Sequence, residues 1–331
     1  MKTRGRHSAD WTEDTSGLLV SKPAEHIREI VCTAEEFLRQ TFPEKHRILD
    51  FLNEREIALI SGWRGAGKTF FILSMLESIT CRVPFGPWQA HKVVPALYLD
   101  GELAEVDLQS RIRALHCHER LAPLYLYSDN MSTSRGLGKA NLSSKKWRDN
   151  LGQLLIDKGI KVWCLDNISS ISGGIQENVA EEWVPVNDWL MDLRFKGITS
   201  ILIHHVGLSG RQRGTTKRED NVDLSIRLVQ PPNHKVDDGA SFILKWEKTR
   251  LAESVTKLLK EYRFHLQTYP NGALGWTWED NERGVKKDIY KLLDEGKTPK
   301  EIADELEVSS SFVYRVKRSR SEGNSKGKKQ G

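Results

Sequence analysis

The chain has 331 residues, of which 38% are hydrophobic, with a net charge of +5, a pI of about 8.9 and a mean hydropathy of −0.50. This composition describes a soluble globular protein with room for one large α/β domain and a small appendage, and no apolar run is long enough to span a membrane. The N-terminus is polar, unlike a signal peptide, and the four dispersed cysteines form no C-x-x-C pair, so we expect a cytoplasmic protein without disulfides or a zinc site.

The first part of the chain is predicted to hold a disordered tail followed by a helix. Residues 1–25 are charged, small and without a periodic pattern, which is typical of disorder. Thr33 and Glu36 form a capping box just before an apolar pair, so a helix is expected to begin there. One ordered domain is then predicted to extend over residues 26–280.

A phosphate-binding motif follows. The sequence from Gly62 to Thr69, GWRGAGKT, matches G-x-x-x-x-G-K-[ST], with an apolar strand before it and an amphipathic segment after it, as the motif requires. Its glycines let backbone N–H groups face an anion, and the helix N-terminus adds a positive dipole end. Lys68 would place a charge beside the β- and γ-phosphates, and the Thr69 hydroxyl would bind Mg²⁺. A glycine-rich turn that binds nothing would leave both residues unexplained.

ATP with Mg²⁺ is therefore the expected cofactor. The predicted strand covers residues 57–60 and the predicted helix covers residues 70–78. The nucleotide is predicted to be held by the motif and the residue after it: Gly62, Trp63, Arg64, Gly65, Ala66, Gly67, Lys68, Thr69 and Phe70.

Strands then alternate with helices, and a group of strands comes last. The predicted strands of the first part are 96–99, 124–127, 162–165 and 199–203. The predicted helices between them are 111–115, 147–157 and 183–195, with a polar loop at 128–144. The later strands are 224–229, 242–246, 263–268 and 276–278, with a hairpin signal at Asn271-Gly272. This order predicts an α/β fold with a mainly parallel twisted sheet and C-terminal β-hairpins.

Three of the predicted strands end in residues that suit nucleotide hydrolysis, because the carboxyl ends of parallel strands open on the ligand crevice. Asp166 ends an apolar strand, where a carboxylate can hold the Mg²⁺ shell as a Walker B aspartate does. Glu102 could orient or deprotonate the attacking water, whereas Asp100 competes for this role or caps the next helix. His204 and His205 end a third strand, where a polar side chain could sense the γ-phosphate; a buried core histidine is the alternative.

Together these motifs resemble the RepA-type ATPases, which are hexameric RecA-fold proteins of plasmids, phages and mobile elements, related to the DnaB helicases and to KaiC. The resemblance covers residues 34–278. It rests on the P-loop and on four further runs: LYLDGE at 97–102, CLDNISS at 164–170, LIHH at 202–205 and QRGTTKRED at 212–220. The P-loop is common to many NTPases, and the paired histidines with the last run are far more specific.

The resemblance implies a hexameric ring with ATP bound between subunits. In such a ring Glu102 takes the place of the RecA-like glutamate, and His205, with His204 beside it, takes the place of the histidine sensor. Lys248 and Arg250 match the basic pair that reaches the γ-phosphate of the neighbouring subunit, where an arginine stabilises transition-state charge. A solvated strand end is the bland alternative for this pair.

The same resemblance assigns DNA contacts to a loop after the histidines. Arg213, in the loop 207–220, would face single-stranded DNA in the central pore or the subunit interface. Leu208 stands where many relatives have a lysine, and this departure weakens the case for a helicase.

From residue 281 the pattern changes to short helices, and residues 281–319 are predicted to form a helix-turn-helix domain. Helices are expected at 285–295, after a capping box at Thr298, and at 312–318. The last helix would read duplex DNA with Ser310, Ser311, Tyr314 and Arg315 near base edges and with Lys317, Arg318 and Arg320 on phosphates. A three-helix protein-interaction module is the alternative, and residues 320–331 are predicted to be a disordered basic tail.

Three functions remain open at this point. The first is an ATP-driven hexameric motor that translocates on DNA, a replicative helicase or a close relative. The second is an ATP-controlled switch or loader that binds duplex DNA through the helix-turn-helix without unwinding it. The third, a small-molecule or nucleotide kinase, is permitted by the P-loop, but the sequence shows no arginine cluster typical of a kinase lid. The first two share ATP hydrolysis, which is the activity that we predict.

Overall fold

The computed structural model of the chain describes residues 11–13, 19–21, 23–116, 118–174, 180–206, 221–232, 234–235, 237, 239–251, 259–306 and 308–327. The chain divides into two compact units, Met1–Glu44 and Lys45–Gly331, and the second holds the P-loop. The domain boundaries predicted after residues 25, 280 and 319 stay predictions.

The first unit contains short elements only: β1 (Trp11–Glu13), β2 (Leu19–Ser21), α1 (Pro23–Ile30) and α2 (Ala34–Leu38). The strands β1 and β2 pair antiparallel within the stretch predicted to be disordered. The predicted capping box is present: Glu36 N donates to Thr33 Oγ1 (3.2 Å), and Thr33 N donates to the Glu36 carboxylate (2.8 Å). These bonds satisfy backbone donors at the helix start, which explains why α2 begins at Ala34.

The second unit contains most of the strands and helices. Its strands are β3 (Arg47–Leu49), β4 (Leu52–Asn53), β5 (Ile57–Gly62), β6 (Ala96–Asp100), β7 (Leu124–Ser128), β8 (Val162–Asp166), β9 (Thr199–His205), β10 (Leu224–Val229), β11 (Ser241–Thr249), β12 (Tyr262–Thr268) and β13 (Leu274–Asp280). Its helices are α3 (Lys68–Cys81), α4 (Glu105–Leu115), α5 (Asp129–Ser134), α6 (Lys145–Asp157), α7 (Ile168–Ile171), α8 (Ala180–Phe195), α10 (Asn281–Asp294), α11 (Pro299–Glu305) and α12 (Ser310–Gly327).

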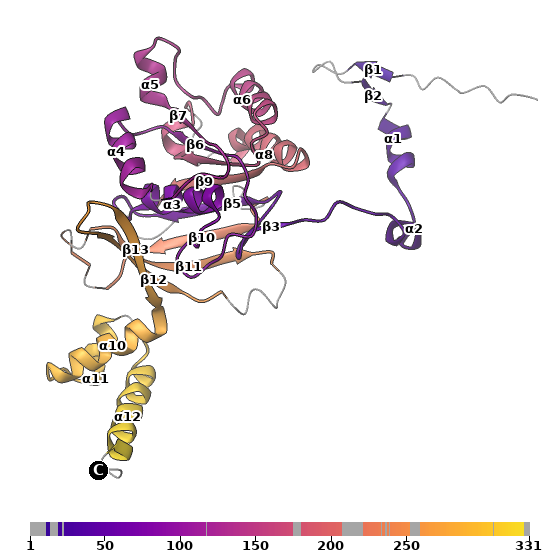
Figure 1. Cartoon of the computed structure of the whole chain (residues 1–331). Coiled ribbons are helices and arrows are strands. Elements are labelled where there is room, and N and C mark those ends of the chain that lie inside the picture. The colour runs from indigo at the N-terminus through magenta and orange to yellow at the C-terminus, as the bar shows by residue number, and fades with distance from the viewer. Residues whose placement is uncertain are drawn as a thin grey trace, which may run out of the picture. The chain divides into compact units, whose positions relative to one another are not determined.

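Strands β5 to β13 form a nine-stranded sheet in the described part of the chain, in the order β13-β12-β11-β10-β5-β9-β8-β6-β7 (Figure 1). The strands from β10 to β7 in this order run parallel, and β11, β12 and β13 continue the sheet antiparallel. The hairpin between β12 and β13 turns at Gly272, whose φ of +81° favours glycine. The predicted α/β class, with a mainly parallel sheet and C-terminal β-hairpins, is confirmed, and the RecA-like and helix-turn-helix assignments stay predictions.

Helices cover both faces of this sheet, because successive side chains of a strand point to opposite faces. In β5, Ala58 and Ile60 pack with α3 and α4, whereas Ile57 and Leu59 pack in a second cluster with α6, α7 and α8. Burial on both faces explains why the central strands are uninterrupted apolar runs in the sequence.

Two short helices, α5 and α7, lie where the sequence predicted no helix, α5 within the polar loop 128–144. Each begins at a polar N-cap. Ser128 Oγ accepts from Met131 N (3.2 Å), and Asn167 Oδ1 accepts from Ser170 N (3.2 Å). A side-chain cap can start a helical turn without the apolar periodicity on which the sequence prediction depended.

The three C-terminal helices share a hydrophobic core of their own. Its buried members are Ile289, Leu292, Ile302, Ala303, Leu306, Val313 and Val316. Helix α10 is also tied to the sheet, because Arg263 of β12 donates to Asn281 and pairs with Asp288. None of the helices in the described part of the chain is both long and apolar enough to cross a membrane.

Helix α12 is longer than predicted. It was expected to stop at Arg318 ahead of a disordered tail, but it continues to Gly327. Arg320 explains part of this difference, because its guanidinium pairs with Asp294 (2.9 Å) and lies 4.9 Å from the ring centroid of Tyr290. These contacts with α10 extend the ordered helix past the end of its apolar pattern.

Candidate nucleotide-binding site

The P-loop joins β5 to α3, as its motif predicts, and its backbone requires glycine. Gly67 has φ +87° at the N-cap of α3, and a Cβ there would lie 2.5 Å from the Cβ of Ala240. Helix α3 begins at Lys68, whose side chain is buried and whose Nζ donates to the carbonyls of Gly62 (2.9 Å) and Trp63 (2.7 Å). Burial lowers the pKa of Lys68 to about 8, although the carboxylates of Asp166 and Glu102 oppose this shift. The loop thus presents a cation at a helix N-terminus, which suits an anionic ligand.

Asp166 lies at the end of β8, directly beside the P-loop. Its Oδ2 accepts hydrogen bonds from Thr69 Oγ1 (2.6 Å) and from Tyr98 OH (2.7 Å). Burial raises the pKa of Asp166, and the two hydrogen bonds act in the opposite direction. The sequence predicted that Asp166 and Thr69 bind the same Mg²⁺ ion, and the structure places their side chains in contact. Tyr98 was missed, although it lies two residues before the end of β6 and so on the same face as Asp100.

This donor set fits Mg²⁺. The ion prefers oxygen ligands and keeps several waters, so a hydroxyl and a carboxylate suffice beside nucleotide phosphates. No group of three or more His, Cys, Asp or Glu that could hold a metal by itself occurs among the described residues. Thr69 and Asp166 are therefore the residues that would hold the ion in a nucleotide complex.

Replacing Tyr98 by phenylalanine is expected to raise about tenfold the Mg²⁺ concentration that gives half-maximal ATP turnover. The ring would stay in the core, but Asp166 would lose one of the two hydrogen bonds that orient its Oδ2. A magnesium titration of ATP hydrolysis measures the effect, with Tyr125→Phe on β7 as the matched control. An unchanged magnesium requirement in Tyr98→Phe would count against the predicted ion site.

A second polar cluster joins the ends of β6, β8 and β9. The Asn167 amide donates to His205 Nε2 (2.9 Å), and Ser170 Oγ donates to Glu102 Oε1 (3.1 Å). His205 Nε2 also lies 3.5 Å from Glu102 Oε1. Burial lowers the pKa of His205, so its imidazole is neutral and can accept from Asn167. Burial acts to raise the pKa of Glu102, but hydrogen bonds from Asn167 and Ser170 oppose it, and the pKa is lowered, which keeps the carboxylate ionised.

Asn167 is a site residue that the sequence reasoning missed. It follows Asp166 at the strand end and connects the end of β8 to His205 at the end of β9. The Asp-Asn pair at the end of an apolar strand was the available signal, because the carboxyl ends of parallel strands meet at the ligand crevice.

The structure separates the two histidines and the two carboxylates between which the sequence left a choice. His205 and Glu102 line the cavity at the P-loop, and His204 and Asp100 are not among the described residues that do. His204 is buried at 2% exposure because neighbouring residues of a strand face opposite sides. Asp100 is also buried, which raises its pKa to about 7, and its Oδ2 accepts from Leu103 N (2.8 Å).

The cavity has a volume of about 910 Å³, enough for a nucleoside triphosphate. Its described lining residues are Trp63, Arg64, Gly65, Gly67, Lys68, Thr69, Phe70, Glu102, Leu103, Arg111, Asp166, His205, Gln230, His234, Gly239 and Ala240. Gly62 and Ala66 of the predicted set are not among these lining residues. At its rim the guanidinium of Arg111 lies 4.9 Å from the Phe70 ring centroid, and His234 meets Trp63 edge to face at 6.1 Å.

Lys248 and Arg250 lie at the opposite edge of the sheet from the P-loop. β11 runs antiparallel to β10, so its last residue, Thr249, pairs with the first residue of β10. Arg250 N donates to Asp223 O (3.0 Å), and Asp223 N donates to Ile57 O (2.8 Å) at the start of β5. The P-loop begins at the other end of β5, roughly 17 Å away at 3.3 Å per residue. Neither residue of the basic pair is among the described residues that line this chain's cavity.

The predicted DNA contacts fall in two places. Arg213 and the rest of the loop 207–220 lie outside the described residues. The predicted recognition residues of α12, apart from the partly buried Arg320, are exposed: Ser310, Ser311, Tyr314, Arg315, Lys317 and Arg318. They surround the buried Val313 and Val316, so α12 has one face toward the three-helix core and one face toward solvent.

The likeness to solved structures is distant. A KaiC-like protein from the hyperthermophilic archaeon Pyrococcus horikoshii OT3 is 16% identical, with a TM-score of 0.46. The similarity covers 69% of this chain and 93% of that chain. No curated protein matches the chain.

The sequence pattern of the AAA domain family matches residues 23–211. This match spans more than half of the chain and includes the P-loop, Glu102, Asp166 and both histidines. Lys68, Thr69 and Asp166, which line one cavity in the site described above, all lie within the matched residues. The chain therefore belongs to the AAA domain family of P-loop ATPases.

Proposed function

We propose that this protein is a ring-forming ATPase that acts on DNA, most closely a RepA-like replicative helicase or translocase of a mobile element. It would work in the cytoplasm as a hexamer, hydrolyse ATP with Mg²⁺ and hold single-stranded DNA in its pore. The observation that carries the ring is the position of Lys248 and Arg250, far from their own cavity and partly open at a sheet edge. A basic pair so placed would serve the nucleotide site of another subunit and not its own.

The residues divide the chemistry among them. Lys68 and the P-loop amides would bind the phosphates, while Thr69 and Asp166 would hold the magnesium ion. Glu102, ionised and next to Ser170, would orient the attacking water and take its proton. Arg250 of the neighbouring subunit would neutralise charge on the γ-phosphoryl group as it develops, which makes hydrolysis depend on assembly. His205 would sense loss of the phosphate through Glu102 and Asn167.

The decisive experiment is ATP hydrolysis by the purified chain alone, with single-stranded DNA and with duplex DNA, together with its mass in solution with and without ATP. Strong stimulation by single strands in a six-fold assembly supports the motor. A monomer that hydrolyses ATP at full rate without DNA would contradict both the ring and the DNA role. Strand separation is then tested on a forked duplex.

The exposed face of α12 favours a second candidate, a switch that binds duplex DNA and uses ATP to control assembly or recruitment. Tyr314 is 58% exposed on a helix that also presents Lys317 and Arg318 to solvent. An aromatic ring and cations on one open face suit a groove and its phosphates. Assembly that depends on duplex DNA, with little stimulation by single strands, would favour this switch over the motor. A protein-interaction module remains the alternative for these helices.

The double variant Tyr314→Ala, Lys317→Ala is expected to weaken duplex binding about tenfold and to leave basal ATP hydrolysis unchanged. Both side chains are exposed, so the three-helix core would stay intact. Fluorescence anisotropy with a labelled duplex at several salt concentrations measures the loss. Lys158→Ala, at the residue that directly follows helix α6, is the control for charge alone. Duplex binding equal to that of the unchanged protein would refute a DNA role for α12.

A further inference from the structure

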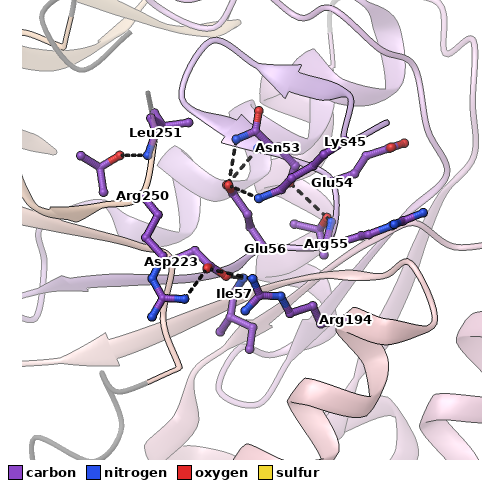
Figure 2. A network of polar contacts seen from close by, with 12 residues as sticks. Lys45, Asn53, Glu54, Arg55, Glu56, Ile57, Arg194, Asp223, Arg250 and Leu251 are labelled. Carbon is purple, nitrogen blue, oxygen red and sulfur yellow. Dashed lines mark hydrogen bonds and ion pairs between the residues drawn. The ribbon is translucent and has the colours of Figure 1, made fainter. Parts of the chain in front are cut away.

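Asp223 is a buried carboxylate at the sheet edge where Arg250 lies. Figure 2 shows Arg250 and Arg194 approaching it from two sides, beside the start of β5. Its Oδ1 lies 3.1 Å from Arg250 Nη1 and 3.2 Å from Arg194 Nη2. Its Oδ2 accepts from Ile57 N (3.0 Å). The residue thus joins β5, β10, the end of β11 and helix α8 at one point.

The two guanidinium groups give this carboxylate cationic partners where the chain is closed to water. The Asp223 side chain is 1% exposed, and a charge at such a depth is stable only when it is paired and hydrogen-bonded. The backbone adds to this, because Arg250 N donates to Asp223 O and Asp223 N donates to Ile57 O. Both oxygens therefore have fixed partners, and the carboxylate has one orientation.

The strand that supports Asp223 is itself held firmly at this end. Glu56, the residue before Ile57, is 2% exposed and accepts from Lys45 Nζ (2.8 Å), Asn53 N (2.9 Å) and Asn53 Nδ2 (2.8 Å). Figure 2 shows this second cluster next to the first. Asp223 is consequently attached to a rigid base, which a residue must have if it is to fix another side chain.

The two arginines differ in how far they are open. The Arg250 side chain is 48% exposed, whereas that of Arg194 is 24% exposed. Arg250 also directly follows Thr249, the last residue of β11, whereas Arg194 lies in the last turn of α8. Only Arg250 therefore has both an anchor on Asp223 and substantial surface available to another molecule.

We propose that Asp223 is the positioning residue for Arg250, holding its guanidinium in the orientation in which it enters the nucleotide site of a neighbouring copy. The inference rests on the proposed function, in which Arg250 acts in trans. A long arginine side chain loses much rotational freedom when it docks, and an anchor that fixes it beforehand removes that loss from the catalytic step. The charge of Asp223 also holds the planar guanidinium group of Arg250 against the sheet, where it would otherwise sample many orientations in solvent. Arg194 serves the burial of Asp223 and takes no part in the neighbour's site.

The test uses Asp223→Asn in the full chain, with Arg250→Ala as the reference and Arg194→Met as the matched control. Asparagine keeps the size of the side chain and an oxygen that can accept from Ile57 N, but it removes the charge that holds Arg250. We expect Asp223→Asn to lower kcat at least about tenfold, part of the effect expected for loss of the arginine, with KM for ATP within twofold. Arg194→Met is expected to lower the thermal midpoint without this loss of kcat.

Mixed assemblies separate positioning from a merely structural role. Asp223→Asn subunits have an intact cavity and a misplaced Arg250, so addition of Glu102→Ala subunits, whose Arg250 is intact, should restore activity. If Asp223→Asn does not fold, Asp223→Glu replaces it, and the longer side chain is expected to lower kcat in the same way.

The outcomes distinguish the inference from the function on which it rests. Arg250→Ala that keeps full activity, or that is not rescued by Glu102→Ala subunits, refutes the trans arginine itself. If Arg250→Ala is rescued, two results overturn the positioning role alone. One is normal turnover by Asp223→Asn, and the other is a loss of kcat in Arg194→Met as large as that in Asp223→Asn.

Discussion

Lys68→Ala is expected to lower ATP turnover by about 10³-fold. Lys68 is the first residue of α3, and its buried Nζ is held by the carbonyls of Gly62 and Trp63 at the floor of the cavity. It is thus positioned before the nucleotide arrives, so its charge acts on the phosphates without reorganisation. Alanine keeps the helix, because it has the highest helix propensity, but it leaves the phosphates without this cation.

Phosphate release from ATP under saturating magnesium measures the effect. Lys145→Ala is the matched control, because Lys145 pairs with Asp149 on the exposed surface of α6 and lies outside the cavity. The thermal midpoints of both variants should stay close to that of the unchanged chain. Undiminished turnover in Lys68→Ala would refute the assignment of the site.

Arg250→Ala is expected to leave ATP binding intact and to lower turnover by about 10³- to 10⁵-fold, the range measured for arginines supplied to a neighbouring site. The reason is the strand direction: β11 delivers Arg250 to the edge of the sheet opposite the P-loop. Its loss therefore changes nothing within its own cavity. Binding of a fluorescent ATP analogue and the rate of hydrolysis, measured on the same preparation, separate the two effects.

Mixing the variants tests whether the arginine acts between subunits. Arg250→Ala and Glu102→Ala subunits should each be inactive, whereas a mixture forms interfaces that combine an intact cavity from the first with an intact arginine from the second. Partial recovery is the expected result. Equal inactivity of the mixture, in assemblies that light scattering shows to be mixed, would argue that Arg250 serves only the stability of its own sheet edge.

The parts of the site that the sequence predicted are those set by neighbouring residues. The P-loop motif, its strand and its helix depend on a few consecutive residues, and the structure places them as predicted from Gly62 to Thr69. Asp166, Glu102 and His205 could be singled out because each comes at or just after the end of an apolar strand, and parallel strands end at one edge of the sheet. Choosing His205 over His204 required knowing which of the two side chains faces the cavity. Alternation along the strand shows only that they face opposite sides.

The parts that the sequence could not predict are contacts between distant segments. Tyr98 reaches Asp166 across 68 positions, and Asn167 reaches His205 across 38. Each contact depends on the strand order β9-β8-β6 and its register, which emerge only when the sheet has assembled.

The sequence by itself determined the fold class and the phosphate-binding loop, because apolar periodicity and a glycine-rich motif act over short stretches of chain. Only the tertiary structure decided where Arg250 lies and what holds it. Asp223 meets Ile57 across 166 positions and Arg250 across 27, and these meetings follow from β10 lying between β5 and β11. Because β11 runs antiparallel to β10, its last residue lies beside the first residue of β10. Arg250, which follows β11, therefore lies at the end of the sheet opposite the P-loop.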